Sequence, residues 1–149
     1  YANGGGGYFD VVNIHPFVDP FPPNGLEALR KVCDAVYKVM RAHGDDEKKI
    51  WITELGCPGM KDPVSADPWW LGRNPTETEQ AEWVEKIYGE PLTWRYIDKI
   101  FWAFFRDTPN HFKSGADGLG LVRDDFTKKP AFEVYLKMAL TWKRGKHSR

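Results

Sequence analysis

The sequence lacks an excess of charge of either sign, and it has little cysteine. Its 21 Lys and Arg residues balance 21 Asp and Glu residues, so the formal net charge at pH 7 is zero. A balanced chain gives no indication of a nucleic-acid or membrane partner. The two cysteines, Cys33 and Cys57, do not make a disulfide framework or a metal site. We expect Cys33 on the apolar stripe of a helix, and Cys57 in the lining of a pocket.

The sequence also lacks a long apolar run, a signal peptide and an initiator Met. No apolar segment is long enough to span a bilayer. Because the first residue is Tyr1, inside a Gly-rich stretch, we expect the chain to be a piece of a longer protein. The compartment therefore stays open, with a secreted parent slightly favoured.

No nucleotide-binding fingerprint follows a predicted strand. The sequence has no G-x-G-x-x-G and no G-K-[ST], and the four glycines at residues 4–7 precede a strand. Rossmann and P-loop folds therefore lose support, and no motif predicts a cofactor or a metal.

What is present is an alternation of β-forming and helical segments. Strands are predicted near residues 8–15, 49–55 and 99–105, and helices near 25–43, 77–89 and 130–142, with a short helical piece at 92–97. Capping boxes, Asn24 with Glu27 and Thr76 with Glu79, mark the starts of the first two helices. The apolar strands are typical of a parallel sheet covered by helices. The sequence therefore predicts one α/β domain with about three parallel strands, each followed by a helix.

Polar and aromatic residues gather at the carboxyl end of every predicted strand. They are Asn13, His15 and Phe17, then Glu54, then Trp102, Arg106 and Asp107. Sites of (β/α) barrels and open α/β sheets lie at that end. Glu54 directly follows a buried strand, and a carboxylate is costly to bury without a partner. We interpret Glu54 as a catalytic candidate, with a salt-bridged loop residue as the alternative, and Arg106 with Asp107 as a structural ion pair.

Each neighbour of Glu54 also has an ordinary structural explanation. His15 is either a structural histidine or a hydrogen-bonding partner of Glu54 from the next strand. Trp102 is either core or an apolar floor for a sugar ring. Trp69 and Trp70 are adjacent in a loop, so at least one of them is a candidate for contact with a ligand.

Four segments together resemble the last three βα units of a clan A glycoside hydrolase, whose fold is a (β/α)8 TIM barrel. They are YFDVVNIHPF, KIWITELG, FWAFFRD and GLGLVRDDFTKKPAFEVY. The resemblance is closest to family 39 glycosidases and then to family 5. It implies that Glu54 is the catalytic nucleophile, that His15 borders it, and that Trp102 floors the sugar subsite. Further substrate-binding candidates are Asn13, Phe17, Trp69 and Trp70.

The resemblance implies that the parent hydrolyses β-linked glycosides with retention. A retaining enzyme uses two carboxyl groups roughly 5 Å apart, and the family's acid/base, in an Asn-Glu pair ending the fourth strand, has no counterpart here. A complete barrel needs eight strands and roughly 250 residues. We therefore expect a partial TIM barrel that is inactive alone. Its cut sheet edges would pair with the missing N-terminal half or with another copy.

Two alternatives stay open at this point. A partial α/β sheet with exposed tryptophans could bind carbohydrate without cleaving it, or act as an assembly unit. A flavodoxin-like domain is weakened by the missing phosphate loop and by the strand that ends in Glu54. A second carboxylate within reach of Glu54 would separate an enzyme from a binding module.

Overall fold

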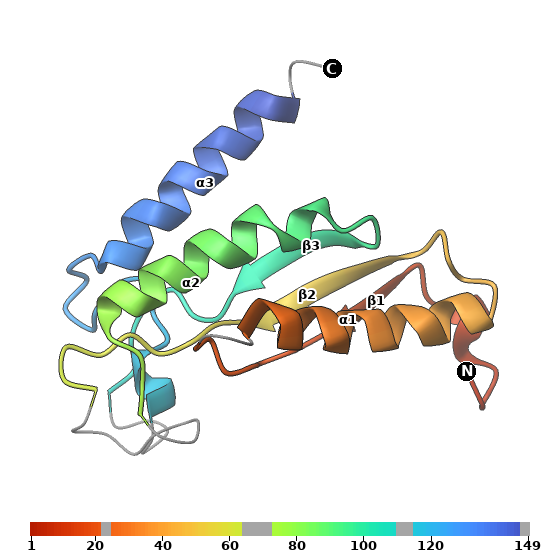
Figure 1. Ribbon diagram of the computed structural model, residues 1–149, viewed down its shortest axis with the longest axis horizontal. Coiled ribbons are helices and arrows are strands. Elements are labelled where there is room, and N and C mark those ends of the chain that lie inside the picture. Colours follow the sequence, from red (N-terminus) through yellow and green to blue (C-terminus); the bar gives the residue numbers. More distant parts are fainter. Residues whose placement is uncertain (22–24, 64–72, 110–114, 147–149) are drawn as a thin grey trace. The chain divides into compact units, whose positions relative to one another are not determined.

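The computed structural model describes residues 1–21, 25–63, 73–109 and 115–146 (Figure 1). The chain forms two compact units, and each is described by itself. The first unit is Tyr1–Leu55 with Glu90–Trp102, and the second is Gly56–Gly89 with Ala103–Arg149. In the ranges that the structure describes, every helix is too short or too polar to cross a lipid bilayer.

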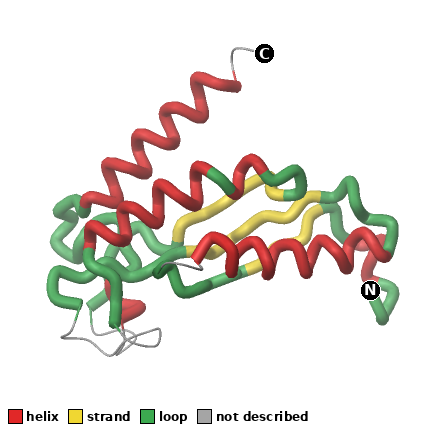
Figure 2. The backbone as a smooth tube through the Cα atoms, in the orientation of Figure 1, coloured by secondary structure: helices red, strands yellow, loops and turns green. Residues whose placement is uncertain are grey.

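The first unit contains a parallel sheet with the strand order β1-β2-β3 (Figure 2). Its elements are η1 (Gly5–Tyr8), β1 (Val11–Ile14), α1 (Gly25–Ala42), β2 (Lys49–Leu55), η2 (Pro91–Thr93) and β3 (Ile97–Trp102). The register of β1 on β2 places Ile14 opposite Ile52. After an irregularity, the register of β2 on β3 places Leu55 opposite Trp102. The prediction of an α/β fold with three parallel strands is confirmed for the described residues.

The core of the first unit lies between α1 and one face of the sheet. Ile50 and Ile52 of β2 are fully buried, as are Leu29 and Cys33 of α1, and Met40 is 1% exposed. Apolar residues at helical spacing form one stripe of α1, and this stripe is what the helix buries. The prediction that Cys33 is a core residue is confirmed.

Helix α1 also contacts the segment that leads into β3. Tyr37 stacks on Tyr96 with ring centroids 4.6 Å apart, and the Tyr96 hydroxyl donates a hydrogen bond to Asp34. Burial, and then the Asp34 carboxylate, raise the pKa of the Tyr96 hydroxyl. Arg30 lies over the Trp94 ring, 5.3 Å from its centroid. These contacts join α1 to the segment just before the amino end of β3, the end remote from Trp102.

The second unit is organised by two helices, α2 (Glu77–Gly89) and α3 (Pro130–Lys146), which pack against each other. Val84 and Ile87 of α2 are fully buried. Tyr88 meets Tyr135 edge to face, with ring centroids 5.2 Å apart. Apolar and aromatic side chains of α2 and α3 therefore contribute to the core of this unit.

The predicted capping box of α2 is confirmed. The Thr76 N–H donates to Glu79 Oε2 at 2.8 Å, and the Glu79 N–H donates to Thr76 Oγ1 at 3.2 Å. Of the other predicted box, Asn24 lies outside the described residues. Its partner Glu27 forms an ion pair with Lys31, with Nζ and Oε1 2.6 Å apart.

The first and third strands differ from their predicted bounds. The segment at 8–15 contributes only Val11–Ile14, because Tyr8 belongs to the 3-10 helix η1 and is 91% exposed. The third strand runs over Ile97–Trp102 instead of 99–105. It stops early because the Phe105 carbonyl already accepts hydrogen bonds from a later loop, at the N–H groups of residues 121 and 122.

The helical bounds agree more closely. The helix predicted at 77–89 has these bounds, that at 25–43 ends at residue 42, and that at 130–142 continues to residue 146. The helical piece predicted at 92–97 is the single 3-10 turn η2. It ends there because the Tyr96 carbonyl already accepts a hydrogen bond from the Ile50 N–H, at 2.8 Å, as part of the sheet.

Candidate functional site

Glu54 lies at the carboxyl end of β2, where the strand alternation breaks. Ile50, Ile52 and Leu55 are buried, whereas Thr53 and Glu54 are both half-buried. The Glu54 side chain keeps 44% of its surface exposed. The strand therefore delivers its carboxylate to solvent rather than to the core, so the desolvation cost that a buried carboxylate would carry is avoided.

His15 lies beside Glu54, at the carboxyl end of β1, because it directly follows Ile14, the last residue of that strand. Its Nδ1 lies 3.6 Å from Glu54 Oε2, and its Nε2 lies 2.9 Å from the Thr53 hydroxyl oxygen. The His15 side chain is 49% exposed. Parallel pairing of β1 with β2 is what places the imidazole beside the carboxylate.

The Thr53 hydroxyl can set which ring nitrogen of His15 carries the proton. If the hydroxyl donates to Nε2, the neutral imidazole has its N–H at Nδ1, the atom that faces Glu54. An N–H on that side would be a donor that can orient the carboxylate. Sequence reasoning missed Thr53. The available signal was its position, one residue before Glu54 in the printed sequence.

Three further predicted site residues, Asn13, Phe17 and Trp102, lie in the described part of the chain. Asn13 is exposed on β1, and Phe17 is half-buried with its N–H donating to the His15 carbonyl at 3.0 Å. Trp102 is half-buried on β3, opposite the residue that follows Glu54. The other two predicted residues, Trp69 and Trp70, lie outside the described residues.

Cys57 does not line a pocket, and that prediction is wrong. The residue is fully buried, and burial raises the pKa of its thiol well above the ordinary value. Its carbonyl instead accepts a hydrogen bond from Gln80 Nε2 at 2.9 Å. Residues 55–59, which directly follow Glu54, are all buried.

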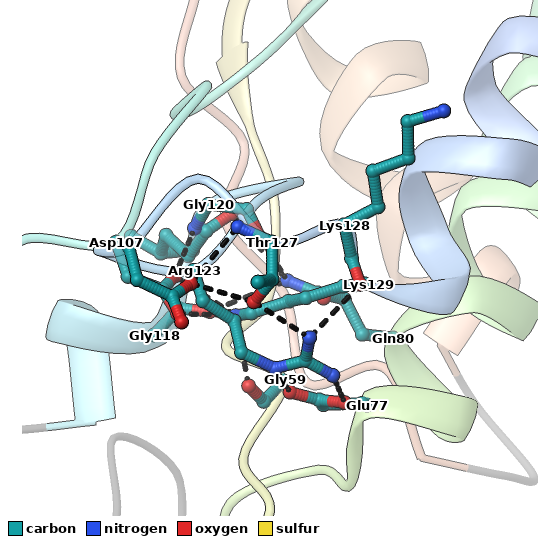
Figure 3. A network of polar contacts seen from close by, with 12 residues as sticks. Gly59, Glu77, Gln80, Asp107, Gly118, Gly120, Arg123, Thr127, Lys128 and Lys129 are labelled. Carbon is teal, nitrogen blue, oxygen red and sulfur yellow. Dashed lines mark hydrogen bonds and ion pairs between the residues drawn. The ribbon is translucent and has the colours of Figure 1, made fainter.

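A buried polar network stands in the second unit and involves that segment (Figure 3). At its centre Lys129, 1% exposed, donates to the carbonyls of Gly59 at 2.9 Å and Gly118 at 2.8 Å. The Lys129 ammonium also lies 2.8 Å from both carboxylate oxygens of Asp107. Beside it, Arg123 makes a two-pronged ion pair with Glu77, with contacts of 2.8 and 2.6 Å.

The prediction that Asp107 forms an ion pair with Arg106 is therefore wrong. Asp107 pairs with Lys129, whereas the Arg106 guanidinium lies over the Phe126 ring, 4.9 Å from its centroid. Burial raises the pKa of Asp107 and lowers that of Lys129, because it disfavours both charged forms more than their mutual attraction restores. This pairing could not be predicted from the sequence, because lysine is rarely fully buried.

Metal ligation finds no support in the described residues. No group of three or more His, Cys, Asp or Glu side chains among them is placed to hold a metal ion. Glu54 and His15 thus stand as a carboxylate–imidazole pair, which suits nucleophilic or proton-transfer chemistry.

The fold is similar to parts of several carbohydrate-active enzymes. A GH2 β-galacturonidase from Eisenbergiella tayi matches with a TM-score of 0.65 and 15% identity, over 91% of this chain and 24% of that one. A GH128 endo-β-1,3-glucanase from Amycolatopsis mediterranei matches with a TM-score of 0.60 and 19% identity, over 89% and 48%. A family 39 glycoside hydrolase from Bacteroides cellulosilyticus matches with a TM-score of 0.58 and 21% identity, over 93% and 28%.

At the level of sequence, no protein-family model and no curated protein matches the chain. The chain spans less than half the length of each of the three similar structures. At these identities the likeness concerns the fold. It joins this chain to folds found in glycoside hydrolases, and the family 39 match agrees with the predicted resemblance.

Proposed function

We propose that the chain is the nucleophile-bearing part of a retaining glycoside hydrolase that acts on β-linked glycosides. The observation that carries the proposal is the meeting of His15 and Glu54 at the carboxyl ends of two adjacent parallel strands. This is the edge at which α/β enzymes hold their substrates. Fold similarity to a galacturonidase, a glucanase and a family 39 hydrolase supports a glycoside as the substrate class.

The proposed reaction has two displacements. A carboxylate oxygen of Glu54 attacks the anomeric carbon, and the bond from that carbon to the leaving oxygen breaks as a second carboxyl group protonates the oxygen. Water, deprotonated by the same second group, then attacks the anomeric carbon and releases Glu54. His15 would hold the attacking carboxylate in place, and Trp102 would contact the sugar.

The second carboxyl group would come from another part of the parent protein. The same part would pair with the outer edges of β1 and β3, each of which has β2 as its neighbour within the described sheet. Without it, we expect the 149-residue chain to self-associate and to hydrolyse ordinary glycosides poorly. Light scattering after gel filtration would measure the association.

Mechanism-based labelling tests the proposal on the chain itself. A 2-deoxy-2-fluoro β-glycoside with a dinitrophenolate leaving group needs no acid to depart, so Glu54 can be trapped even where the second carboxyl group is missing. A panel of glucoside, glucuronide and galacturonide reagents would be applied, followed by peptide mapping. We expect one label on Glu54. Glu54→Gln should lose the label completely, and Glu90→Gln, in the same unit, should keep it.

The competing function is a module that binds carbohydrate without cleaving it. The observation in its favour is the aromatic face of the sheet, where Phe101 is 46% exposed and lies 6.2 Å from the Trp51 ring, centroid to centroid. Quenching of tryptophan fluorescence by oligosaccharides, together with no label on Glu54 in the chain or in its parent, would overturn the hydrolase proposal and favour this module.

A further inference from the structure

Two loops that follow the ends of neighbouring strands are joined in the second unit. Loop A, residues 56–60, continues directly from β2, and loop B, residues 103–129, continues directly from β3. Their backbones meet where the Gly59 N–H of loop A donates to the Gly118 carbonyl of loop B, at 2.9 Å. The two strands that lead into these loops carry Glu54 and Trp102.

Lys129 bonds both loops with one side chain. Its ammonium donates to the Gly59 carbonyl of loop A, at 2.9 Å, and to the Gly118 carbonyl of loop B, at 2.8 Å. A third hydrogen bond goes to Asp107 Oδ1, also in loop B, at 2.8 Å. An ammonium group has three N–H donors, so all of them are used inside the protein. Figure 3 shows Lys129 extending between these partners.

Two further groups make this junction specific. Asp107 Oδ1, besides its contact with Lys129, accepts a hydrogen bond from the Gly120 N–H at 2.8 Å. Gln80 of α2 is fully buried, and its Nε2 lies 2.9 Å from the Cys57 carbonyl of loop A and 3.3 Å from the Gly120 carbonyl of loop B. Lys129 and Gln80 therefore each connect the same two loops, and Asp107 supplies the charge that balances the buried ammonium.

The junction is too closely packed for a side chain at three of its glycines. A Cβ atom at Gly118 would lie 2.5 Å from Met60 Sδ, and one at Gly59 would collide with the Gln80 side chain. A Cβ at Gly120 would meet the backbone of residues 106 and 107. Each of these three positions therefore requires glycine as long as the loops stay joined as they are.

We propose that Lys129 is a positioning residue that locks loop A to loop B and thereby fixes the end of β2 that carries Glu54. Only Leu55 separates Glu54 from the first residue of loop A, so a loop A released from loop B would no longer restrain the end of β2 from its carboxyl side, and the pairing with β1 and β3 would be the restraint that is left. The consequence for catalysis rests on the function proposed above. The lock itself does not, and the experiment separates the two.

The test compares Lys129→Met with the matched control Lys128→Met in the 149-residue chain. Lys128 is adjacent but exposed, and its ammonium pairs with Glu133 at the surface. Amide hydrogen exchange would be followed at the N–H groups of Gly59 and Gly120, and the ¹⁵N shifts of the His15 ring would report on the site. For Lys129→Met we expect exchange at both amides to rise by about tenfold or more, and the His15 shifts to change. For Lys128→Met we expect neither.

Each outcome decides the proposal. Unchanged exchange in Lys129→Met would overturn the lock. Faster exchange with unchanged His15 shifts would overturn the positioning role and leave a structural lysine. If Lys129→Met does not fold, Asp107→Asn, which keeps the size and one carbonyl oxygen of the side chain, should give the same pattern at smaller amplitude, and its absence would overturn the proposal. None of these readouts requires turnover of a glycoside.

Discussion

Two of the paired carboxylates, Glu54 and Asp107, lie in opposite environments. Glu54 has an imidazole nitrogen at 3.6 Å and keeps 44% of its side chain exposed. Asp107 has an ammonium at 2.8 Å, a backbone N–H at 2.8 Å and only 17% exposure. The carboxylate of Asp107 is occupied by hydrogen bonds within the protein. The carboxylate of Glu54 is half-exposed and can still contact a ligand. The comparison teaches that the shorter and more buried ion pair is the structural one.

Breaking the buried pair should produce the largest loss of stability. Lys129→Met would remove the cationic partner of Asp107 and one donor from the carbonyls of Gly59 and Gly118, and we expect a loss of about 3–5 kcal/mol in the free energy of unfolding. Urea titration followed by circular dichroism would measure it. A loss below about 1 kcal/mol would mean that Asp107 finds another donor.

Breaking the exposed pair should act on reactivity instead. Thr53→Val keeps the shape of the side chain but removes the hydroxyl that faces His15 Nε2. We expect the rate of labelling at Glu54 to fall by about tenfold, because one orienting hydrogen bond contributes about 0.5–1.5 kcal/mol, while the unfolding midpoint barely moves. An unchanged labelling rate would remove Thr53 from the site.

The capping box of α2 offers an intermediate case with a defined pH dependence. A hydrogen bond from Arg73, followed by those from Thr76, lowers the pKa of Glu79 to about 2. A carboxyl whose pKa is depressed on folding stabilises the protein above its unfolded pKa of about 4.3, and this contribution disappears as the pH falls toward 2. We expect about 1 kcal/mol to be lost over this window. Glu79→Gln should lack this part of the pH dependence in acid titrations of stability.

The smallest effect should come from the exposed neighbour of Lys129. Lys128 and Glu133 are 56% and 59% exposed, with their charged atoms 3.0 Å apart. Such surface pairs contribute about 0–1 kcal/mol, so Lys128→Met should change the free energy of unfolding by about 0.5 kcal/mol or less. A cost comparable to that of Lys129→Met would contradict the contrast between buried and exposed pairs.

The sequence predicts well where local signals agree. The helix at residues 77–89 has both a capping box and apolar residues at helical spacing, and its bounds match. The predicted third strand ends three residues too late, at 105 instead of Trp102, because Phe104 and Phe105 have β-forming side chains. In the structure their side chains are 40% and 59% exposed. The Phe105 carbonyl bonds the N–H groups of residues 121 and 122, which are distant in sequence, instead of a neighbouring strand. Local propensity cannot anticipate these hydrogen bonds.

The candidate site divides in the same way. Glu54 and His15 could be picked out because polar residues at strand ends of a parallel sheet meet at one edge. Lys129 could not, because its burial depends on carbonyls contributed by residues 59 and 118, far from it in sequence. A residue type that is usually exposed carries no sequence signal for such a role.

The base of the loop that leaves β2 has a consequence for loop grafting. The Met60 N–H donates to the Pro75 carbonyl at 2.9 Å, and the Glu77 N–H donates to the Met60 carbonyl at 3.3 Å, so the segment between Met60 and Pro75 is closed at its stem. Doubling the length of a loop on a closed stem costs only about 0.6 kcal/mol in closure entropy. A segment of foreign length grafted onto this stem would still have to keep Arg73, which pairs with Glu79, and the buried Asn74.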